Sequence, residues 1–249
     1  MGGKKNRKRK VRSASGKPFV SVCTPTYNRR IFIPQLIKCF LEQDYPREKM
    51  EWIVVDDGED SVEDLFKDVP CVKYHRVEEK MKLGRKRNYM HELSKGDILV
   101  YMDDDDYYPP CRVSHAVGKL EGQPRVLAAG SSMVYLYFND LEAIYRFGPY
   151  GRSHATAGTF AFKRKLLEET RYDDDAELAE EKAFLKNYTI PFTQLEPLKS
   201  IFVFAHQYNT FDKRNLLKNP NPAFVHEMRT MKLKDCIRAK WARDFYTSI

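Results

Sequence analysis

The sequence lacks any apolar run long enough to cross a bilayer. The longest candidate, residues 126–138, is interrupted by Gly130, Ser131 and Ser132, and a membrane-spanning helix needs about 20 apolar residues in a row. The basic amino terminus has no apolar segment behind it, so it does not resemble a secretory signal. With 249 residues, 42% of them hydrophobic, we expect a soluble protein with a substantial core.

Cysteines and glycine-rich loops are also scarce. The five cysteines are an odd number without close spacing, so we expect free thiols in a reducing compartment such as the cytoplasm. No Cys/His spacing typical of zinc is present. Neither G-x-x-x-x-G-K nor G-x-G-x-x-G occurs, which argues against P-loop and dinucleotide enzymes. A sugar-nucleotide nucleotidyltransferase stays as an alternative, although residues 24–30 lack the glycines that we expect of it.

Positive charge is concentrated at the amino terminus. The chain has 43 basic and 35 acidic residues, and residues 1–17 carry eight basic residues and no acid, which accounts for the whole net charge of +8. A tail this basic and this poor in hydrophobes predicts disorder over residues 1–16. It is either a solubilising extension or an arm for nuclear localisation or for a polyanion. The last reading would make the chain a nucleic-acid-binding module, our second alternative.

Short apolar runs alternate with helical periodicity in the first half of the chain. We predict strands over residues 19–24, 51–55, 71–76 and 97–102, and helices over residues 33–41, 61–67, 84–95 and 112–120. Repeated βα units indicate an α/β fold with a mostly parallel sheet flanked by helices.

The second half mixes strands and helices without a repeat and suits a region that shapes an acceptor pocket. We predict a strand over residues 126–129, a hairpin over 133–138 and 142–147, a strand over 159–162, helices over 163–170 and 176–187, and strands over 192–195 and 200–205. One domain would span residues 17–212. Residues 213–249 read as a helical extension or linker, with a basic helix over 223–246.

Four consecutive aspartates, Asp103 to Asp106, directly follow the apolar strand. Acidic runs usually lie on a solvated surface, but adjacent like charges beside a buried strand are costly unless a divalent cation screens them. In open α/β sheets, ligands gather outside the carboxyl ends of the strands. The loops at residues 24–29 and 56–58 should meet the aspartates there. Together they suggest a site that holds a nucleotide diphosphate through Mg²⁺ or Mn²⁺.

The residues in these loops resemble a known family. Val-Ser-Val-Cys-Thr-Pro-Thr-Tyr-Asn-Arg at 20–29, Trp-Ile-Val-Val-Asp-Asp-Gly at 52–58 and the aspartate run, in this order, resemble glycosyltransferase family 2, of the GT-A fold. The resemblance runs from about residue 19 to about residue 210. It implies a metal-dependent, inverting hexosyl- or pentosyltransferase of glycan biosynthesis. A nucleotide sugar would be the donor, and a glycan, glycoprotein or other hydroxyl compound the acceptor.

The resemblance also assigns a donor site. The segment at 25–28 resembles the part that holds base and ribose, Asp57 the acid that hydrogen-bonds the base, and residues 84–88 the Gly-x-x-Arg-Asn segment. For Lys86 we prefer a solvated helix start. The donor-binding candidates are Pro25, Thr26, Tyr27, Asn28, Arg29, Asp57, Arg85, Arg87, Asp103 and Asp104.

Metal and catalytic roles follow from the same resemblance. Asp103 and Asp105 occupy the Asp-x-Asp positions, with Asp105 as the direct ligand, and His206 resembles a histidine that reaches the metal or the diphosphate. An inverting transfer needs a base. Glu180 and Glu181 lie where the family usually has Glu-Asp before an aromatic helix, so Glu181 is the candidate base and Glu180 its neighbour. Asp173, Asp174 and Asp175 are rivals that a surface turn explains equally well.

Aromatic side chains are a further source of binding surface. Trp52, Tyr107, Tyr108 and Tyr150 have rings that stack well on a sugar or a base. Tyrosine is abundant in this chain, however, and packing in the core is the default role of such rings.

Overall fold

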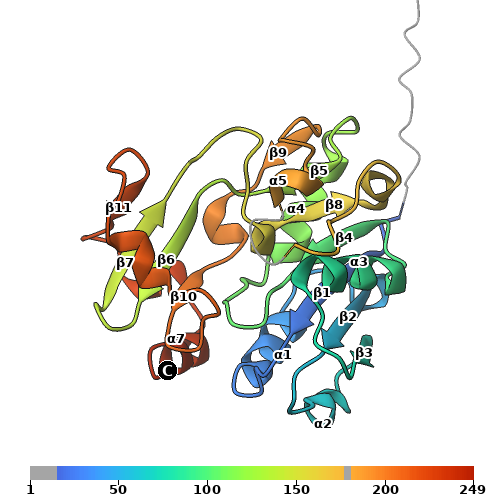
Figure 1. Cartoon of the computed structure of the whole chain (residues 1–249), viewed down its shortest axis with the longest axis horizontal. Helices are drawn as coiled ribbons and strands as arrows, with labels where there is room; N and C mark the ends of the chain where they lie inside the picture. Colours follow the sequence, from blue (N-terminus) through green and yellow to red (C-terminus); the bar gives the residue numbers. More distant parts are fainter. Residues whose placement is uncertain (1–15, 177–180) are drawn as a thin grey trace, which may run out of the picture.

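The computed structural model describes residues 16–176 and 181–249. A seven-stranded sheet, in the order β3-β2-β1-β4-β8-β5-β9, stands beside a four-stranded sheet, in the order β10-β6-β7-β11 (Figure 1). The strands are β1 Val20–Thr26, β2 Met50–Asp56, β3 Val72–Arg76, β4 Ile98–Tyr101, β5 Ala128–Gly130, β6 Val134–Phe138, β7 Ala143–Phe147, β8 Ala161–Lys163, β9 Phe192–Gln194, β10 Val203–Ala205 and β11 Val225–Glu227.

Helices connect these strands. The α-helices are α1 Ile33–Leu41, α2 Glu63–Phe66, α3 Leu83–Leu93, α4 Arg112–Glu121, α5 Glu181–Phe184, α6 Leu233–Cys236 and α7 Lys240–Tyr246. The 3-10 helices are η1 Arg47–Lys49, η2 Ala157–Thr159, η3 Arg164–Glu168, η4 Pro197–Lys199 and η5 Lys213–Leu217. No helix in the two described ranges is both long and apolar enough to span a membrane.

The expected mostly parallel α/β sheet is confirmed. β1 pairs in parallel with β2 on one side and with β4 on the other, so Val20 is aligned with both Met50 and Ile98. β8 runs antiparallel between β4 and β5. The carboxyl ends of β1, β2 and β4 therefore lie at one edge of the sheet, which is where ligands bind in open α/β folds.

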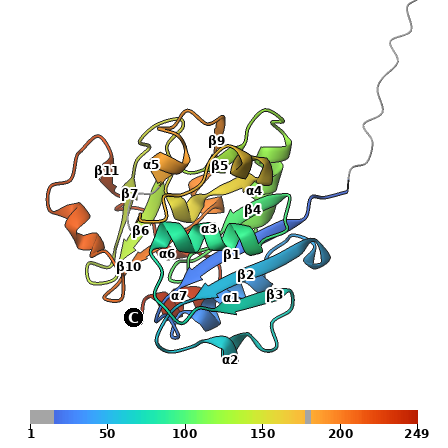
Figure 2. The same ribbon diagram turned by 45° about the vertical axis from the view of Figure 1, so that its right-hand side comes forward.

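Both faces of this sheet are buried. Val22 and Trp52 point into one apolar layer together with Leu36 of α1, whereas Cys23 and Ile53 point into the opposite layer, under α3. Figure 2 shows α3 lying across its face of the sheet. Side chains alternate along a strand, and helices cover both faces, so the strands read in the sequence as continuous apolar runs.

The second half corrects several expectations. The predicted hairpin forms as β6 and β7, but residues 163–170 contain the 3-10 helix η3 in place of an α-helix. A continuous helix over residues 223–246 is wrong, because Val225–Glu227 forms β11 and pairs with β7. The open edge of β7 offers hydrogen bonds that outweigh the local helical pattern. Of the predicted helix at 176–187, residues 177–180 lie outside the described residues, as do residues 1–15 of the predicted tail.

The carboxyl-terminal segment packs against the same core. Ile237, Ala242 and Tyr246 are fully buried, and the Tyr246 hydroxyl donates to the carbonyl oxygen of Asp106 at 2.8 Å. Helix α7 therefore supports the loop that carries the aspartates.

A buried histidine makes the stability of the fold depend on pH. His91 Nε2 lies 2.6 Å from the Tyr101 hydroxyl, and burial lowers the pKa of His91 to about 3. The unfolded chain, with a pKa of about 6.5, binds this proton more readily, so stability falls as the pH drops from about 6.5 toward 3. The loss should be about 3 kcal/mol at pH 4.5.

Urea unfolding of the wild type and of His91→Gln at pH 7 and pH 4.5 checks this expectation. The variant lacks the histidine proton, so its free energy of unfolding should fall less on acidification. Equal losses in the two proteins would contradict the role of His91.

Candidate active site

The carboxyl ends of β1 and β4 border a cavity of about 220 Å³. Its walls contain residues from the β1 loop, from α3, from the aspartate run and from the segment after β10. They are Pro25, Thr26, Tyr27, Arg29, Leu83, Lys86, Arg87, Asp103, Asp104, Asp105 and Thr210. Most of the predicted donor-binding residues are thus brought together.

The four aspartates do not share one environment. Asp103 and Asp105 are half-buried, whereas Asp104 and Asp106 are buried. Burial, reinforced by Asp105, raises the pKa of Asp104 to about 7, and Arg29 Nε lies 3.7 Å from this carboxylate. Burial also raises the pKa of Asp106, which accepts a hydrogen bond from the Phe204 backbone at 3.2 Å. Asp106 is therefore tied to the second sheet, while the other three line the cavity.

Asp105 lines this cavity and meets His206, which lines a second cavity of about 360 Å³. His206 Nε2 lies 3.8 Å from Asp105 Oδ2, and the side-chain amide nitrogen of Asn209 is 3.1 Å from both atoms. Burial lowers the pKa of His206 to about 4. Burial opposes ionisation of Asp105 too, but Lys213, Arg29 and the other polar groups around it together outweigh burial, and the pKa of Asp105 is lowered. At neutral pH the pair is a carboxylate and a neutral imidazole.

This pair fits a divalent cation that is shared with a substrate. Among residues 16–176 and 181–249, no three His, Cys, Asp or Glu side chains form a ready metal cluster. Mg²⁺ sites, however, typically use one or two carboxylates and complete their coordination with substrate phosphates and water. Carboxylate and neutral imidazole are both suitable ligands for first-row divalent ions. Asp105 and His206 supply such a pair, and Asp103 lies two residues away.

Lys86 differs from its expected position. The sequence favours a solvated side chain, but Lys86 is buried and forms an ion pair with Asp57, and its Nζ donates to the Thr26 carbonyl oxygen at 3.2 Å. Asp57 has no exposed side-chain surface and also accepts from the Met81 backbone at 2.6 Å. A buried charge requires such a partner. Asp57 thus holds Lys86 against the cavity and does not line the cavity itself.

Two other predicted donor residues also lie off the aspartate cavity. Arg85 is exposed and lines a separate cavity of about 490 Å³ together with Arg76 and Arg171. Asn28 has a left-handed backbone with φ of 53°, and its Oδ1 accepts from the Glu59 backbone at 2.7 Å. Asn28 therefore joins the loops that follow β1 and β2.

Glu181 lies next to a turn that touches the aspartates. Its Oε1 accepts a hydrogen bond from the Ala157 backbone at 3.0 Å. A Cβ on Gly158, the residue after Ala157, would lie 2.7 Å from Asp103 Oδ2, so the turn packs closely against this carboxylate. Glu180 lies outside the described residues. The candidate base is therefore hydrogen-bonded to Ala157, and the next residue, Gly158, contacts Asp103 on the donor side.

The rival carboxylates are on the surface. Asp174 pairs with Arg171 at 2.9 Å, and Asp175 pairs with Lys82 at 3.0 Å. Both aspartates are exposed, as expected of a surface turn.

Two residues support the site from behind: Tyr108, which the sequence offered only as a stacking ring, and Arg112, which it did not single out. The Tyr108 hydroxyl accepts from the Asp103 backbone at 2.7 Å and donates to the Gly158 carbonyl oxygen at 3.3 Å. Arg112 is fully buried, and its Nη2 donates to the carbonyl oxygens of Tyr101 and Phe160. The only signal in the sequence is that both follow the aspartates closely.

A protein-family model matches the part of the chain that carries the aspartates. Residues 21–171 match the model of glycosyl transferase family 2. The chain belongs to this family. The resemblance drawn from the strand-end motifs is thereby confirmed, and with it the chain's place among the family 2 glycosyltransferases.

Relatives of this family 2 chain have been described in several organisms. The glucosyl-dolichyl phosphate glucuronosyltransferase of Haloferax volcanii is 30% identical over 122 residues, which are 47% of this chain and 38% of the relative. The putative teichuronic acid biosynthesis glycosyltransferase TuaG of Bacillus subtilis is 34% identical over 95 residues, 36% of this chain and 37% of the relative. The chain thus spans less than half the length of these curated relatives.

Solved structures share the fold. The mannosyltransferase PcManGT of Pyrobaculum calidifontis, in complex with GDP-Man and Mn²⁺, has a TM-score of 0.61 at 20% identity, covering 78% of this chain and 59% of its own. TarS of S. aureus, in complex with UDP-GlcNAc, has a TM-score of 0.58 at 18% identity, covering 77% and 60%. The expected GT-A architecture is confirmed.

The Lys86–Asp57 pair gives a test of how the cavity wall is held. Lys86→Met removes one partner and leaves a buried carboxylate, so the free energy of unfolding should fall by about 3 to 5 kcal/mol. Arg85→Met is the matched control on the exposed side of the same helix and should change it by less than about 0.5 kcal/mol. Urea unfolding measures both. Equal effects would mean that the ion pair does not support the wall.

Proposed function

We propose that this chain is a metal-dependent, inverting glycosyltransferase that transfers a sugar from a nucleotide sugar to an acceptor hydroxyl in glycan synthesis. The observation that carries the proposal is the cavity at the ends of parallel strands, where Arg29 lies beside Asp104, Arg87 lies beside Asp103, and the half-buried Asp105 lines the same wall. Solved neighbours that hold GDP-Man with Mn²⁺ or UDP-GlcNAc support it. Mn²⁺ and Mg²⁺ are the cations we expect.

Different residues of the chain would bind the cation and the diphosphate of the donor. Asp105 and His206, with Asp103 close by, would hold the cation, which when bound stabilises the charge on the departing nucleoside diphosphate as a Lewis acid. Arg29 donates to the Thr210 hydroxyl at 3.1 Å and lies beside Asp104. Arg29 would thereby place positive charge where the diphosphate binds. Its hydrogen bond to Thr210 also links the segment after β10 to the β1 loop.

The transfer itself is a direct displacement. The acceptor oxygen forms a bond to the anomeric carbon while the bond from that carbon to the β-phosphate oxygen breaks, and Glu181 takes the proton from the acceptor hydroxyl. Attack from the side opposite the leaving group inverts the anomeric configuration. The Ala157 backbone amide holds one carboxylate oxygen of Glu181 and so fixes its direction.

A reducing compartment agrees with the cysteines. All five are free thiols, and Cys23 and Cys39 are buried as small apolar side chains. We infer that the protein works in the cytoplasm or a similarly reducing environment.

Loss of the metal ligand should abolish donor binding. Calorimetric titration with UDP or GDP, with and without Mn²⁺, should give metal-dependent binding in the wild type and none in Asp105→Ala. Asp175→Ala removes a surface carboxylate and should bind as the wild type does. Deletion of residues 1–16 should also leave binding intact. Nucleotide affinity that is indifferent to Mn²⁺ and to Asp105 would contradict the proposal.

Removal of the base should separate binding from turnover. Glu181→Gln keeps the shape and the contact with Ala157 but cannot take a proton, so turnover should fall by about 10²-fold or more at nearly unchanged donor affinity. An NMR time course on the product should give inversion at the anomeric carbon. Normal turnover in the variant would move the role to another carboxylate, and a product with retained configuration would exclude the single-base mechanism.

A further inference from the structure

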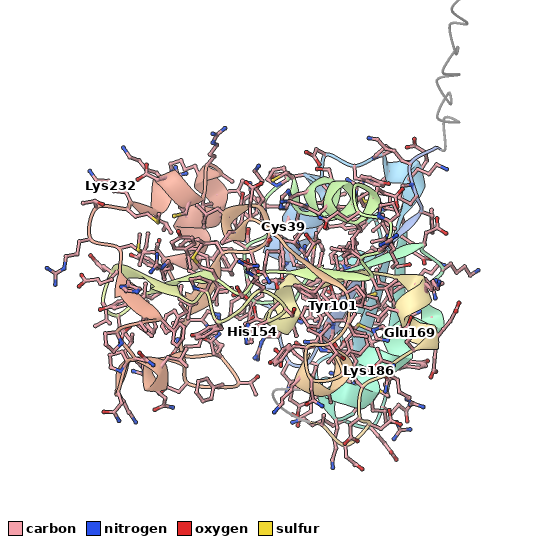
Figure 3. All side chains as sticks on the ribbon, turned by 90° about the horizontal axis from the view of Figure 1, so that it is seen from above. Cys39, Tyr101, His154, Glu169, Lys186 and Lys232 are labelled. Carbon is pink, nitrogen blue, oxygen red and sulfur yellow. The ribbon has the colours of Figure 1, made fainter. Side chains whose placement is uncertain are left out.

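Four aromatic rings form a continuous strip at the junction of the two sheets. Tyr150 lies 5.1 Å from Phe224 on one side and 5.1 Å from His154 on the other, and His154 lies 5.5 Å from Tyr188, all between ring centroids. We call these residues the aromatic strip. They come from the loop after β7, the turn after α5 and the residue before β11. Figure 3 shows His154 between the two halves of the molecule.

The strip leads to the candidate base. Tyr188 follows Asn187, whose backbone amide donates to the carbonyl oxygen of Lys182, the residue after Glu181. His154 is three residues before Ala157, whose amide holds the Glu181 carboxylate at 3.0 Å. Along the chain, His154 is four residues from Gly158, which touches Asp103, so it lies at most about 14 Å away. An acceptor on the strip would therefore extend outward from the base.

The backbone that presents Tyr188 is strained. Lys186, Asn187 and Tyr188 all have left-handed φ angles, of 48°, 55° and 63°. Such a conformation is costly for lysine and tyrosine, though less so for asparagine, and strain of this kind gathers at functional sites. The Asn187 amide donates to the Lys182 carbonyl oxygen at 2.8 Å and closes the turn. The chain accepts this cost while leaving Tyr188 half-exposed, so core packing alone does not account for it.

The exposed surface of the strip combines apolar faces with polar edges. Among the four aromatic candidates from the sequence, Trp52, Tyr107 and Tyr108 are buried at 0 to 3% exposure, whereas Tyr150 is 42% exposed. His154 and Tyr188 are half-buried beside it. Tyrosine rings offer a flat apolar face and a hydroxyl at the rim. A pyranose has the matching surface, with C–H groups on its face and hydroxyls around its edge.

We propose that the aromatic strip is the acceptor subsite and that it takes a saccharide, whose rings stack on Tyr150 and Tyr188 and place a hydroxyl at Glu181. This inference rests on the proposed function and narrows it from hydroxyl acceptors in general to glycans. A lipid would require an aliphatic surface, and the strip is made of aromatic rings with polar edges.

The test compares transfer to saccharides with transfer to water. The probes are methyl glycosides of common hexoses, pentoses and N-acetylhexosamines, offered to the full chain with Mn²⁺ and the nucleotide sugar that it hydrolyses. In Tyr150→Ala and Tyr188→Ala, the KM for the saccharide should rise tenfold or more, while donor hydrolysis changes less than twofold. Tyr188→Phe keeps the ring and should restore KM to within about threefold, because stacking needs the ring and not the hydroxyl.

Phe211→Ala is the matched control, because Phe211 is 46% exposed but lies outside the strip, and it should leave both reactions unchanged. Saccharide KM values that stay at the wild-type level in both alanine variants would overturn the inference. So would a wild type that hydrolyses its donor and transfers to none of the glycosides. A wild type that neither binds UDP or GDP nor hydrolyses any donor would instead refute the proposed function. If Tyr188→Ala misfolds and therefore loses nucleotide binding, the saccharide KM values of Tyr150→Ala and Tyr188→Phe test the inference instead.

Discussion

The concentration of negative charge after β4 is the constraint on which this structure depends. Adjacent carboxylates at the end of a buried strand repel each other and lose hydration, so each needs a compensating group. Arg29 comes from the β1 loop, Arg87 from α3, and Asn209 and Lys213 from the segment after β10. These groups are far apart in the sequence, and only the folded chain brings them to one cavity. A divalent cation, bound together with a diphosphate, would add further positive charge beside the same carboxylates.

The first half of the fold follows from the sequence because its signals are local. Buried strands give unbroken apolar runs, and parallel pairing fixes which loops must meet, so the cavity at β1 and β4 was predictable from Thr26 and Asp103 alone. Lys86 was not predictable in this way. Its position at a helix start says nothing about burial, which depends on Asp57, 29 residues away in the sequence. Periodicity does not encode the partner of a buried charge.

The second half could be predicted much less well, for physical reasons that particular residues illustrate. β10 and β11 have three residues each, too few to display a period, and exist because β6 and β7 offer open edges. In the left-handed turn ending at Tyr188, Lys186 and Tyr188 adopt a backbone conformation that their residue types disfavour. Tyr150 and Tyr108 are the same residue type, yet one is exposed and the other is fixed behind Asp103. Only tertiary contacts distinguish them.

The donor and acceptor sides of the proposed site share one piece of backbone. Tyr108 joins the Asp103 amide to the Gly158 carbonyl, and the Ala157 amide, next in the chain, holds Glu181. A shift of the aspartate loop must therefore move the candidate base with it. The family usually has aspartate where this chain has Glu181. The glutamate side chain has one more rotatable bond, so by itself its carboxylate would be held less firmly in one direction. Because Ala157 anchors one of its oxygens, the extra methylene adds reach without freeing the carboxylate. The backbone hydrogen bond thus does the positioning that a shorter side chain would otherwise provide.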